Sequence, residues 1–231
     1  MPLQIDFHSH VLPGLDHGCR DLKTAHSQLE LVRNGGTDIL VATSHFYPHR
    51  MNLEGFLAQR EAACKLLLKN LPEKCPKIAV GAETACYPGI ENMKGLEQLC
   101  IAGTDCLLLE MPTTEWKDAH FEAVDAILDR GIRVILAHID RYDPKDVDQI
   151  MELDVMAQIN TKSPASFFGA RKWKRFFAED RVWALGSDLH GAEKGAYDHF
   201  PKAIAKLGKE TVQQVMAHSE ELIRTARFLQ D

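Results

Sequence analysis

Two kinds of hydrophobic pattern alternate along the chain. Short runs rich in Val, Ile and Leu recur at intervals, and such runs are typical of strands buried on both faces of a parallel sheet. Longer stretches between them carry apolar residues every three to four positions, which indicates helices with one buried face. The short runs predict strands at Leu3–His8, Asp38–Thr43, Lys77–Glu83, Asp105–Glu110, Ile132–His138, Val155–Asn160 and Arg181–Ser187.

Glycine and proline support the helices that the longer stretches predict. Gly35 and Gly36 follow the first stretch and Gly131 follows the fourth, as expected of helix C-termini. Pro144 stands in the first turn of the fifth, where a missing N–H does no harm. The predicted helices are Asp21–Asn34, Leu53–Asn70, Glu91–Leu99, Asp118–Arg130, Pro144–Leu153, Arg171–Ala178, Asp198–Leu207 and Glu210–Leu229.

Strands that alternate with helices imply a parallel sheet with right-handed crossovers. Seven strands without an evident linker favour an α/β fold in which residues 1–231 form a single domain closed into a barrel. An open doubly wound sheet is the alternative. A dinucleotide-binding fold has no support, because no Gly-x-Gly-x-x-Gly motif follows the first strand.

Acids and histidines stand where these strands end. His8 and His10 alternate on the first strand, so both point to one face. In barrels and open α/β sheets, chemistry collects at the carboxyl ends of the strands. The same position on later strands is filled by His45, Glu83, Glu110, His138, Asp188 and His190.

The carboxylates at these strand ends need positive partners. Glu110 follows a Leu-Leu-Leu run and is costly to bury as an unpaired charge. Arg141 is the cationic side chain that the strand ends offer, which is too little for Glu83, Glu110 and Asp188 together. A cluster of divalent metal ions supplies the missing positive charge, and the sequence therefore predicts a multinuclear metal site.

Other polar residues have more than one interpretation. Asp6 shares the face of His8 and His10, either as a ligand or as an acceptor that orients a metal-bound imidazole. Asp16 is a further candidate ligand or supporting acid on the loop after the first strand, and Asn160 either lines the pocket or only ends a strand. The histidines interpreted as surface residues are His26, His49, His120, His199 and His218, with His49 the foremost exception.

The composition and charge of the chain limit its expected partners and cellular location. The net charge of −6 argues against a nucleic-acid partner, which normally leaves a basic footprint. No apolar run approaches the roughly 20 residues needed to cross a bilayer, and no signal-peptide pattern opens the chain, so we expect a cytoplasmic protein without membrane insertion. Six scattered cysteines form no Cys-x-x-Cys pair and show no phosphate-loop signature of a cysteine phosphatase.

Six motifs together resemble the PHP (polymerase and histidinol phosphatase) superfamily. They are Asp-Phe-His-Ser-His at 6–10, Ala-Thr-Ser-His at 42–45, Gly-Ala-Glu at 81–83, Leu-Glu-Met-Pro at 109–112, Ala-His-Ile-Asp-Arg-Tyr at 137–142 and Ser-Asp-Leu-His at 187–190. Within it, the chain is most similar to the tyrosine-protein phosphatases encoded with bacterial capsule and exopolysaccharide genes. The Leu-Pro-Gly-Leu-Asp loop at 12–16 and the segment from Gln158 to Gly169 add to this resemblance.

The resemblance implies a distorted seven-stranded, TIM-like β/α barrel of the PHP type, with two or three divalent metal ions. Mn²⁺ is the first expectation, and Fe, Zn²⁺ and Mg²⁺ are alternatives. It implies one metal held by His8, His10, Glu83 and Asp188, a second by Glu83, Glu110 and His138, and a third by His45, His190 and a residue near 16–17. His17 stands where these phosphatases carry an acid, which leaves the third site one negative charge poorer.

The resemblance also implies an activity, namely hydrolysis of phosphotyrosine by a metal-activated water. Arg141 matches an arginine near the phosphate, as a catalytic and substrate-binding residue, and Lys194 stands near the position where a second arginine is expected. The implied partner is a capsule-regulating tyrosine kinase, and the basic segment Arg171–Arg175 is either a docking surface for its acidic tail or a solvated helix face. The alternatives are another phosphomonoester such as histidinol phosphate, and a catalytically weak metal-binding regulator.

Overall fold

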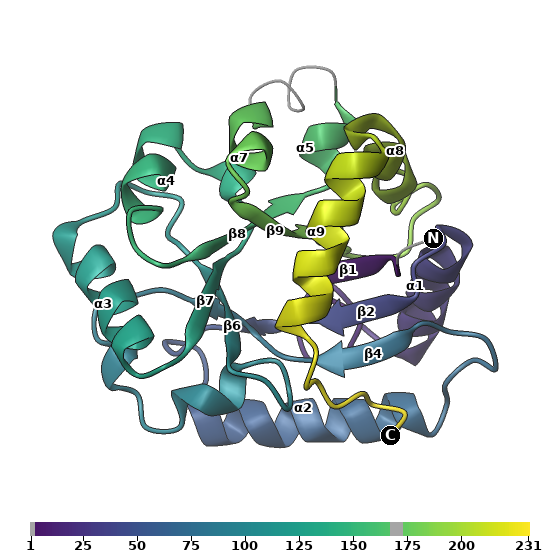
Figure 1. Cartoon of the computed structure of the whole chain (residues 1–231). Coiled ribbons are helices and arrows are strands. Elements are labelled where there is room, and N and C mark those ends of the chain that lie inside the picture. Colours follow the sequence, from purple (N-terminus) through teal and green to yellow (C-terminus); the bar gives the residue numbers. More distant parts are fainter. Residues whose placement is uncertain (1–2, 167–172) are drawn as a thin grey trace.

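The computed structural model describes residues 3–166 and 173–231. Within these ranges all paired strands are parallel and form two sheets around a common centre (Figure 1). The first sheet has the order β1 (Ile5–Ser9), β2 (Ile39–Ala42), β4 (Lys77–Val80). The second has the order β3 (His45–Phe46), β5 (Glu83–Ala85), β6 (Cys106–Glu110), β7 (Arg133–Leu136), β8 (Met156–Asn160), β9 (Val182–Gly186).

Two of the seven predicted strands are each followed, after a break, by a second short strand. The strand predicted at 38–43 continues after a short interruption as β3, and the strand predicted at 77–83 continues as β5. Backbone bonds bridge the break, because Gly81 donates to Ala42 O at 2.9 Å and Glu83 donates to Thr43 O at 3.1 Å. The seven strand positions are therefore kept, and the break is the distortion that separates one sheet from the other.

The first and last strands lie side by side. Asp188 N–H donates to His8 O at 2.8 Å, and His10 N–H donates to Leu189 O at 3.1 Å. These bonds join β1 to the segment that leaves β9, so strand follows strand around the molecule. The parallel α/β fold is confirmed, and the strand arrangement is that of a distorted barrel.

Helices cover the outside of the strands (Figure 1). Asp21 caps α1 (Leu22–Asn34) by accepting from Thr24 N–H, and Asn52 caps α2 by accepting from Gly55 N–H. In Figure 1 the long helix α9 crosses β9 and β1. The remaining described α-helices are α2 (Leu53–Leu68), α3 (Asp118–Asp129), α4 (Pro144–Ile150), α5 (Lys162–Ala165), α7 (Lys174–Ala178), α8 (His199–Leu207) and α9 (Lys209–Leu222).

Two helix predictions were wrong in extent. The stretch predicted as one helix at 91–99 forms two 3₁₀ turns, η1 (Ile90–Asn92) and η2 (Leu96–Leu99), because Gly95 between them adopts a φ of 83°. The helix predicted to reach Leu229 ends at Leu222. The residues beyond it turn back to the sheet, where Leu229 N–H donates to Ile78 O at 2.7 Å.

The apolar strands form the core as their pattern predicts. Leu107, Leu108 and Leu109 of β6 are at most 1% exposed, and Glu110 alone ends that strand with a partly exposed side chain. No helix within residues 3–166 and 173–231 has the length and apolar character needed to cross a membrane. Phe168, Gly169, Arg171 and Lys172, on which parts of the sequence predictions rest, lie outside the described residues.

Candidate metal centre

The carboxyl ends of the strands bring the predicted acids and histidines together. His8 Nε2 and His10 Nε2 lie 3.1 Å apart, and each is 3.3 Å from Glu83 Oε2. Asp188 Oδ1 completes this group at 3.6 Å from His8 Nε2 and 3.4 Å from His10 Nε2. All four side chains are buried, although they come from β1, β5 and the end of β9.

Glu83 links this group to a second one. Its Oε1 lies 2.7 Å from His138 Nε2, and its Oε2 lies 2.7 Å from His45 Nδ1. Glu110 Oε1 is 3.6 Å from the same His138 nitrogen. His45, Glu83 and Glu110 each offer an atom within 4.8 Å of the others, so both Glu83 oxygens face candidate ligands.

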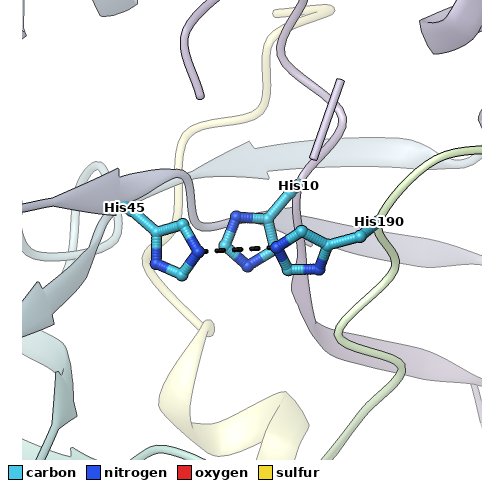
Figure 2. A group of neighbouring side chains, drawn as sticks. All are labelled: His10, His45 and His190. Carbon is cyan, nitrogen blue, oxygen red and sulfur yellow. Dashed lines mark hydrogen bonds between the residues drawn. The ribbon is translucent and has the colours of Figure 1, made fainter. Parts of the chain in front are cut away.

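A third group consists of imidazoles. Figure 2 shows the rings of His10, His45 and His190 facing one another, with His45 Nε2 and His190 Nε2 3.4 Å apart. The exposed His17 ring stacks on His45 at 4.9 Å between centroids and lies 4.7 Å from the His190 ring. The structure thus brings all nine predicted metal-site residues into one place, with His17 on the solvent side.

The donor set fits divalent metal ions. Glu83 Oε2 and Asp188 Oδ1 are buried, and in the described part of the chain they face imidazole nitrogens, with His45 Nδ1 2.7 Å from Glu83 Oε2 and His190 Nδ1 3.3 Å from Asp188 Oδ1. A buried carboxylate needs a positive partner, and an imidazole is positive only when it is protonated, so these oxygens point to a missing cation. Imidazole and carboxylate are ligands that Mn²⁺, Fe and Zn²⁺ accept.

The electrostatics of the cluster agree with this fit. Burial favours a high pKa for Glu83, but the His8 charge and hydrogen bonds from His10, His138 and His45 outweigh burial and hold its pKa well below the usual range. Burial lowers the pKa of His138, but Glu110 and Glu83 outweigh burial and raise it to about 9. The pocket therefore holds its acids charged and favours cations beside them.

Surrounding residues fix His8 and His10 through their other ring nitrogens, and they fix His45 through the nitrogen that also faces Glu83. Asp16 Oδ2 lies 2.8 Å from His10 Nδ1, and the Tyr47 hydroxyl lies 3.0 Å from His45 Nδ1. Gln158 Oε1 lies 3.1 Å from His8 Nδ1 and accepts from His138 N–H at 2.7 Å. Asp16 is thus placed as a supporting acid behind His10, and the sequence predictions missed Gln158 and Tyr47.

Asp6 does not orient an imidazole, so that expectation was wrong. Its Oδ1 accepts from Ser187 N–H at 2.8 Å, and its Oδ2 accepts from the Tyr197 hydroxyl at 2.9 Å. Gln158, and not Asp6, contacts the outer nitrogen of His8. Burial raises the pKa of Asp6 to about 6, although these hydrogen bonds oppose the shift.

Two side chains hold Asp188 from the outer side. Arg141 forms an ion pair with Asp188 Oδ2, and Asn160 Nδ2 donates to the same oxygen at 3.0 Å. Asp188 Oδ1 is thereby left to face the histidines. The Arg141 side chain is 43% exposed, so it borders both the cluster and solvent, and Lys194 is an exposed residue of the loop after His190.

The backbone is unusual at the same place. His138 and Asp188 have φ values of 34° and 52°, which non-glycine residues rarely adopt. A Cβ on Gly18 would lie 2.3 Å from His10 Cβ, and a Cβ on Gly186 would lie 2.5 Å from both His8 Cβ and Gln158 Nε2. Close packing at these two glycines therefore sets the positions of His8 and His10.

The remaining histidines lie apart from these groups. His120 is only 9% exposed, so its surface assignment was wrong, and its Nδ1 accepts from Lys117 N–H at the start of α3. His199 is half-buried, because its Nδ1 lies 2.7 Å from Thr161 Oγ1 beneath α8. His26 and His218 are also partly buried, and His218 stacks on Trp183 and contacts Asp180, whereas His49 is exposed, as expected of a surface residue.

A family model matches almost the whole chain. The model describes CpsB/CapC proteins of capsular polysaccharide synthesis and matches residues 4–224. Tyrosine-protein phosphatase CpsB of Streptococcus pneumoniae is 30% identical over 234 aligned positions, which cover 89% of this chain and 93% of that protein. Tyrosine-protein phosphatase YwqE of Bacillus subtilis is 24% identical over 216 positions, which cover 89% and 84%.

Solved structures share the fold. One chain from the crystal structures of B. subtilis YwqE and S. pneumoniae CpsB, described as unique metal-dependent tyrosine phosphatases, superposes with a TM-score of 0.80 at 19% identity. The match covers 97% of this chain and 96% of that one. A TatD-family hydrolase of Entamoeba histolytica superposes with a TM-score of 0.58 at 9% identity over 96% of this chain and 98% of that one.

Proposed function

The chain belongs to the CpsB/CapC family of capsular polysaccharide synthesis proteins, and from this premise we propose that it is a metal-dependent protein-tyrosine phosphatase. The activity would reside in one domain spanning residues 1–231. The observation that carries the proposal is the pair of buried carboxylate oxygens, Glu83 Oε2 and Asp188 Oδ1, that face histidine nitrogens from several strands. The names of the related CpsB and YwqE proteins support phosphotyrosine as the substrate.

Nine side chains would hold the metal ions. One ion would be bound by His8, His10, Glu83 and Asp188, a second by Glu83, Glu110 and His138, and a third by His45, His190 and His17. Mn²⁺ is our first choice for two or three ions, with Fe, Zn²⁺ or Mg²⁺ as the other candidates. Such ions, when bound, neutralise phosphoryl oxygens and lower the pKa of water.

The chain's own residues would position the substrate and the ligands. Arg141, paired with Asp188 and open to solvent, would bind the phosphoryl group and stabilise charge that develops on it. Lys194 would add a positive charge at the rim of the site. Gln158, Asp16 and Tyr47 would keep the imidazoles of His8, His10 and His45 oriented.

A cysteine nucleophile has little support in this fold. Burial raises the pKa of four thiols to about 12, so they stay protonated at neutral pH. They are Cys19, Cys86, Cys100 and Cys106.

Family membership supports a role in capsule or exopolysaccharide regulation. We place the protein in the cytoplasm, with a capsule-regulating tyrosine kinase as the phosphoprotein substrate. The basic segment Arg171–Arg175 is a weaker candidate for docking, because Arg175 pairs with Asp148 and Trp173 is buried.

The proposal is tested by a substrate panel with Mn²⁺ and with a chelator. The panel comprises a phosphotyrosine peptide, histidinol phosphate and an oligonucleotide with a terminal phosphate. Turnover of the peptide, lost with chelator and restored by Mn²⁺, is the expected result. Preference for histidinol phosphate would replace the substrate assignment, and absence of any turnover would favour a metal-binding regulator.

A further inference from the structure

A groove opens beside the candidate metal centre. It has a volume of about 670 Å³, within the roughly 300–1,000 Å³ typical of small-molecule sites. Glu110 and Tyr47 line it and also belong to the cluster, since Glu110 faces His138 and the Tyr47 hydroxyl contacts His45. The groove is therefore continuous with the place where a phosphoryl group would sit.

Three neighbouring strands build this groove in the same way. β3, β5 and β6 run parallel, with His45 paired to Glu83 and Ala85 paired to Glu110. Each strand carries a candidate metal ligand and then continues outward into residues that line the groove. These residues are Tyr47 and His49 after His45, Ala85 and Tyr87 after Glu83, and Met111 and Pro112 after Glu110.

The wall of the groove is aromatic and apolar. The Tyr47 ring stacks on His45 at 5.0 Å between centroids, and His49 follows at 5.8 Å from Tyr47. Cys86 N–H donates to Glu110 O at 2.7 Å, which holds two walls together. Residues of strand β5 alternate between faces, so Ala85 shares the face of Glu83, and the small Ala85 side chain leaves the space between Tyr47 and Met111 open.

The charges of the residues that line the groove determine which phosphate esters fit it. Of the ten lining residues in the described part of the chain, Glu110 is the one acid and none is Lys or Arg. The Arg50 guanidinium stacks on Tyr47 at 5.0 Å from the ring centroid but is not part of the lining, so a second phosphate has no cation within the described lining itself. A substrate amine, such as that of histidinol phosphate, would need an acid of its own, but Glu110 is already directed at the cluster. A neutral aromatic ring fits these walls, because it removes apolar surface from water without requiring a charged partner.

We propose that this groove binds the phenyl ring of phosphotyrosine and makes the enzyme select aryl over alkyl phosphate esters. The inference rests on the proposed phosphatase function and assigns its specificity to Tyr87 and Ala85. A phosphoserine side chain has no ring to cover these walls, so both its binding and its turnover are weaker.

The test compares one peptide sequence carrying phosphotyrosine or phosphoserine, with the Mn²⁺-loaded full chain. Tyr87→Ala lowers the ratio of the two kcat/KM values about tenfold, because one aromatic wall is lost. Tyr87→Phe keeps the ring and retains the ratio. Ala85→Leu fills the groove and lowers the ratio by a larger factor, on the order of a hundredfold. Leu66→Ala, on the exposed face of α2, is the surface control.

Calorimetry separates the groove from catalysis. Phenylphosphonate binds the wild-type protein more tightly than methylphosphonate, and Tyr87→Ala removes most of that difference. Equal losses on both peptides, or an unchanged ratio in Tyr87→Ala, overturn the groove assignment while leaving the phosphatase intact. If neither peptide is hydrolysed, the proposed function fails, and equal binding of the two phosphonates then overturns the groove separately. If Ala85→Leu does not fold, the comparison of Tyr87→Ala with Tyr87→Phe tests the groove assignment.

Discussion

Two clusters of side chains surround buried carboxylates, and they are built in opposite ways. Asp6 on β1 has both oxygens occupied, by Ser187 N–H and the Tyr197 hydroxyl, and Tyr197 continues to Thr37 Oγ1 at 2.8 Å. Glu83 and Asp188 are equally buried, yet Glu83 Oε2 and Asp188 Oδ1 face imidazole nitrogens and accept from no backbone N–H in the described part of the chain. We call the Asp6 cluster, in which both carboxylate oxygens accept hydrogen bonds from neutral donors, the closed cluster. We call the cluster of Glu83 and Asp188 the open cluster.

The pKa values follow the same division. Burial raises the pKa of Asp6 to about 6, because its partners are neutral. Burial favours the same shift for Asp188, but hydrogen bonds from His10 and His190 and the His8 and Arg141 charges outweigh it and lower its pKa. A closed carboxylate joins strands, whereas an open one surrounded by imidazoles is held charged and ready for a cation.

The largest effect is expected from Glu83→Gln in the open cluster. The change keeps the side-chain volume but removes the charge shared by two groups of candidate ligands, so phosphatase activity falls by about a thousandfold or more. The amide keeps an oxygen that can face His138 Nε2, which lies 2.7 Å from Glu83 Oε1, so the variant is expected to fold and to lose activity through the lost charge. Metal content, peptide turnover and urea unfolding measure this. A fully active variant contradicts the ligand assignment.

Asp6→Ala in the closed cluster is expected to act on stability instead. It leaves Ser187 N–H and the Tyr197 hydroxyl without an acceptor, so the free energy of unfolding falls by about 3 kcal/mol. Urea unfolding at pH 7 measures the loss. Asp6→Asn is the matched control, because its carbonyl oxygen still accepts from Ser187, and it loses less. Unchanged stability in Asp6→Ala would remove the distinction between the clusters.

Gln158→Ala tests the support behind the open cluster. Gln158 contacts His8 Nδ1 and His138 N–H. Its removal therefore leaves the His8 ring and the strained backbone at His138 without a contact that orients them. We expect Mn²⁺ affinity to fall by about 10- to 100-fold, as for other residues behind metal ligands. Isothermal titration measures it, with Gln149→Ala on the exposed side of α4 as the control. Equal affinities in the two variants would show that Gln158 plays no such part.

The smallest effect concerns His199, which is outside both clusters. Burial and the nearby Lys162 charge lower its pKa to about 4. As pH falls through about 6.5, His199 becomes protonated in the unfolded chain but stays neutral in the folded chain. The free energy of unfolding therefore decreases between about pH 6.5 and 4. The loss is about 1 kcal/mol, because the ring is partly exposed to solvent. His199→Gln should flatten this part of the stability curve, and an unchanged slope would contradict the assignment.

The sequence predicted the open cluster better than the closed one. His8, Glu83, Glu110, His138 and Asp188 were found because each stands where an apolar strand ends, and parallel strands end at one edge. Asp6 alternates with His8 and His10 along the first strand, so the sequence puts all three on one face. No neighbouring residue in the sequence indicates that the hydrogen-bond donor to Asp6 is Tyr197, far along the chain.

What the sequence did not reveal depends on contacts between distant segments. Gln158 on β8 reaches His8 on β1 because Gly186 of β9 leaves no side chain between them. The breaks that separate β2 from β3 and β4 from β5 fall at Thr43-Ser44 and Gly81-Ala82, where no proline marks them. These breaks turn the ends of the strands toward the centre and so position His45 and Glu83. The hydrophobic pattern of the sequence does not reveal such a bend.

Metal content tests the central claim most directly. The full chain and its Glu83→Gln and Asp6→Asn variants are treated with chelator, loaded with Mn²⁺, freed of excess metal and analysed for bound metal per chain. The account predicts two or three ions in the wild-type protein, a similar number in Asp6→Asn and a loss of at least one ion in Glu83→Gln. Equal metal content in the wild-type protein and Glu83→Gln, or no retained metal in either, would contradict a metal centre at the open cluster.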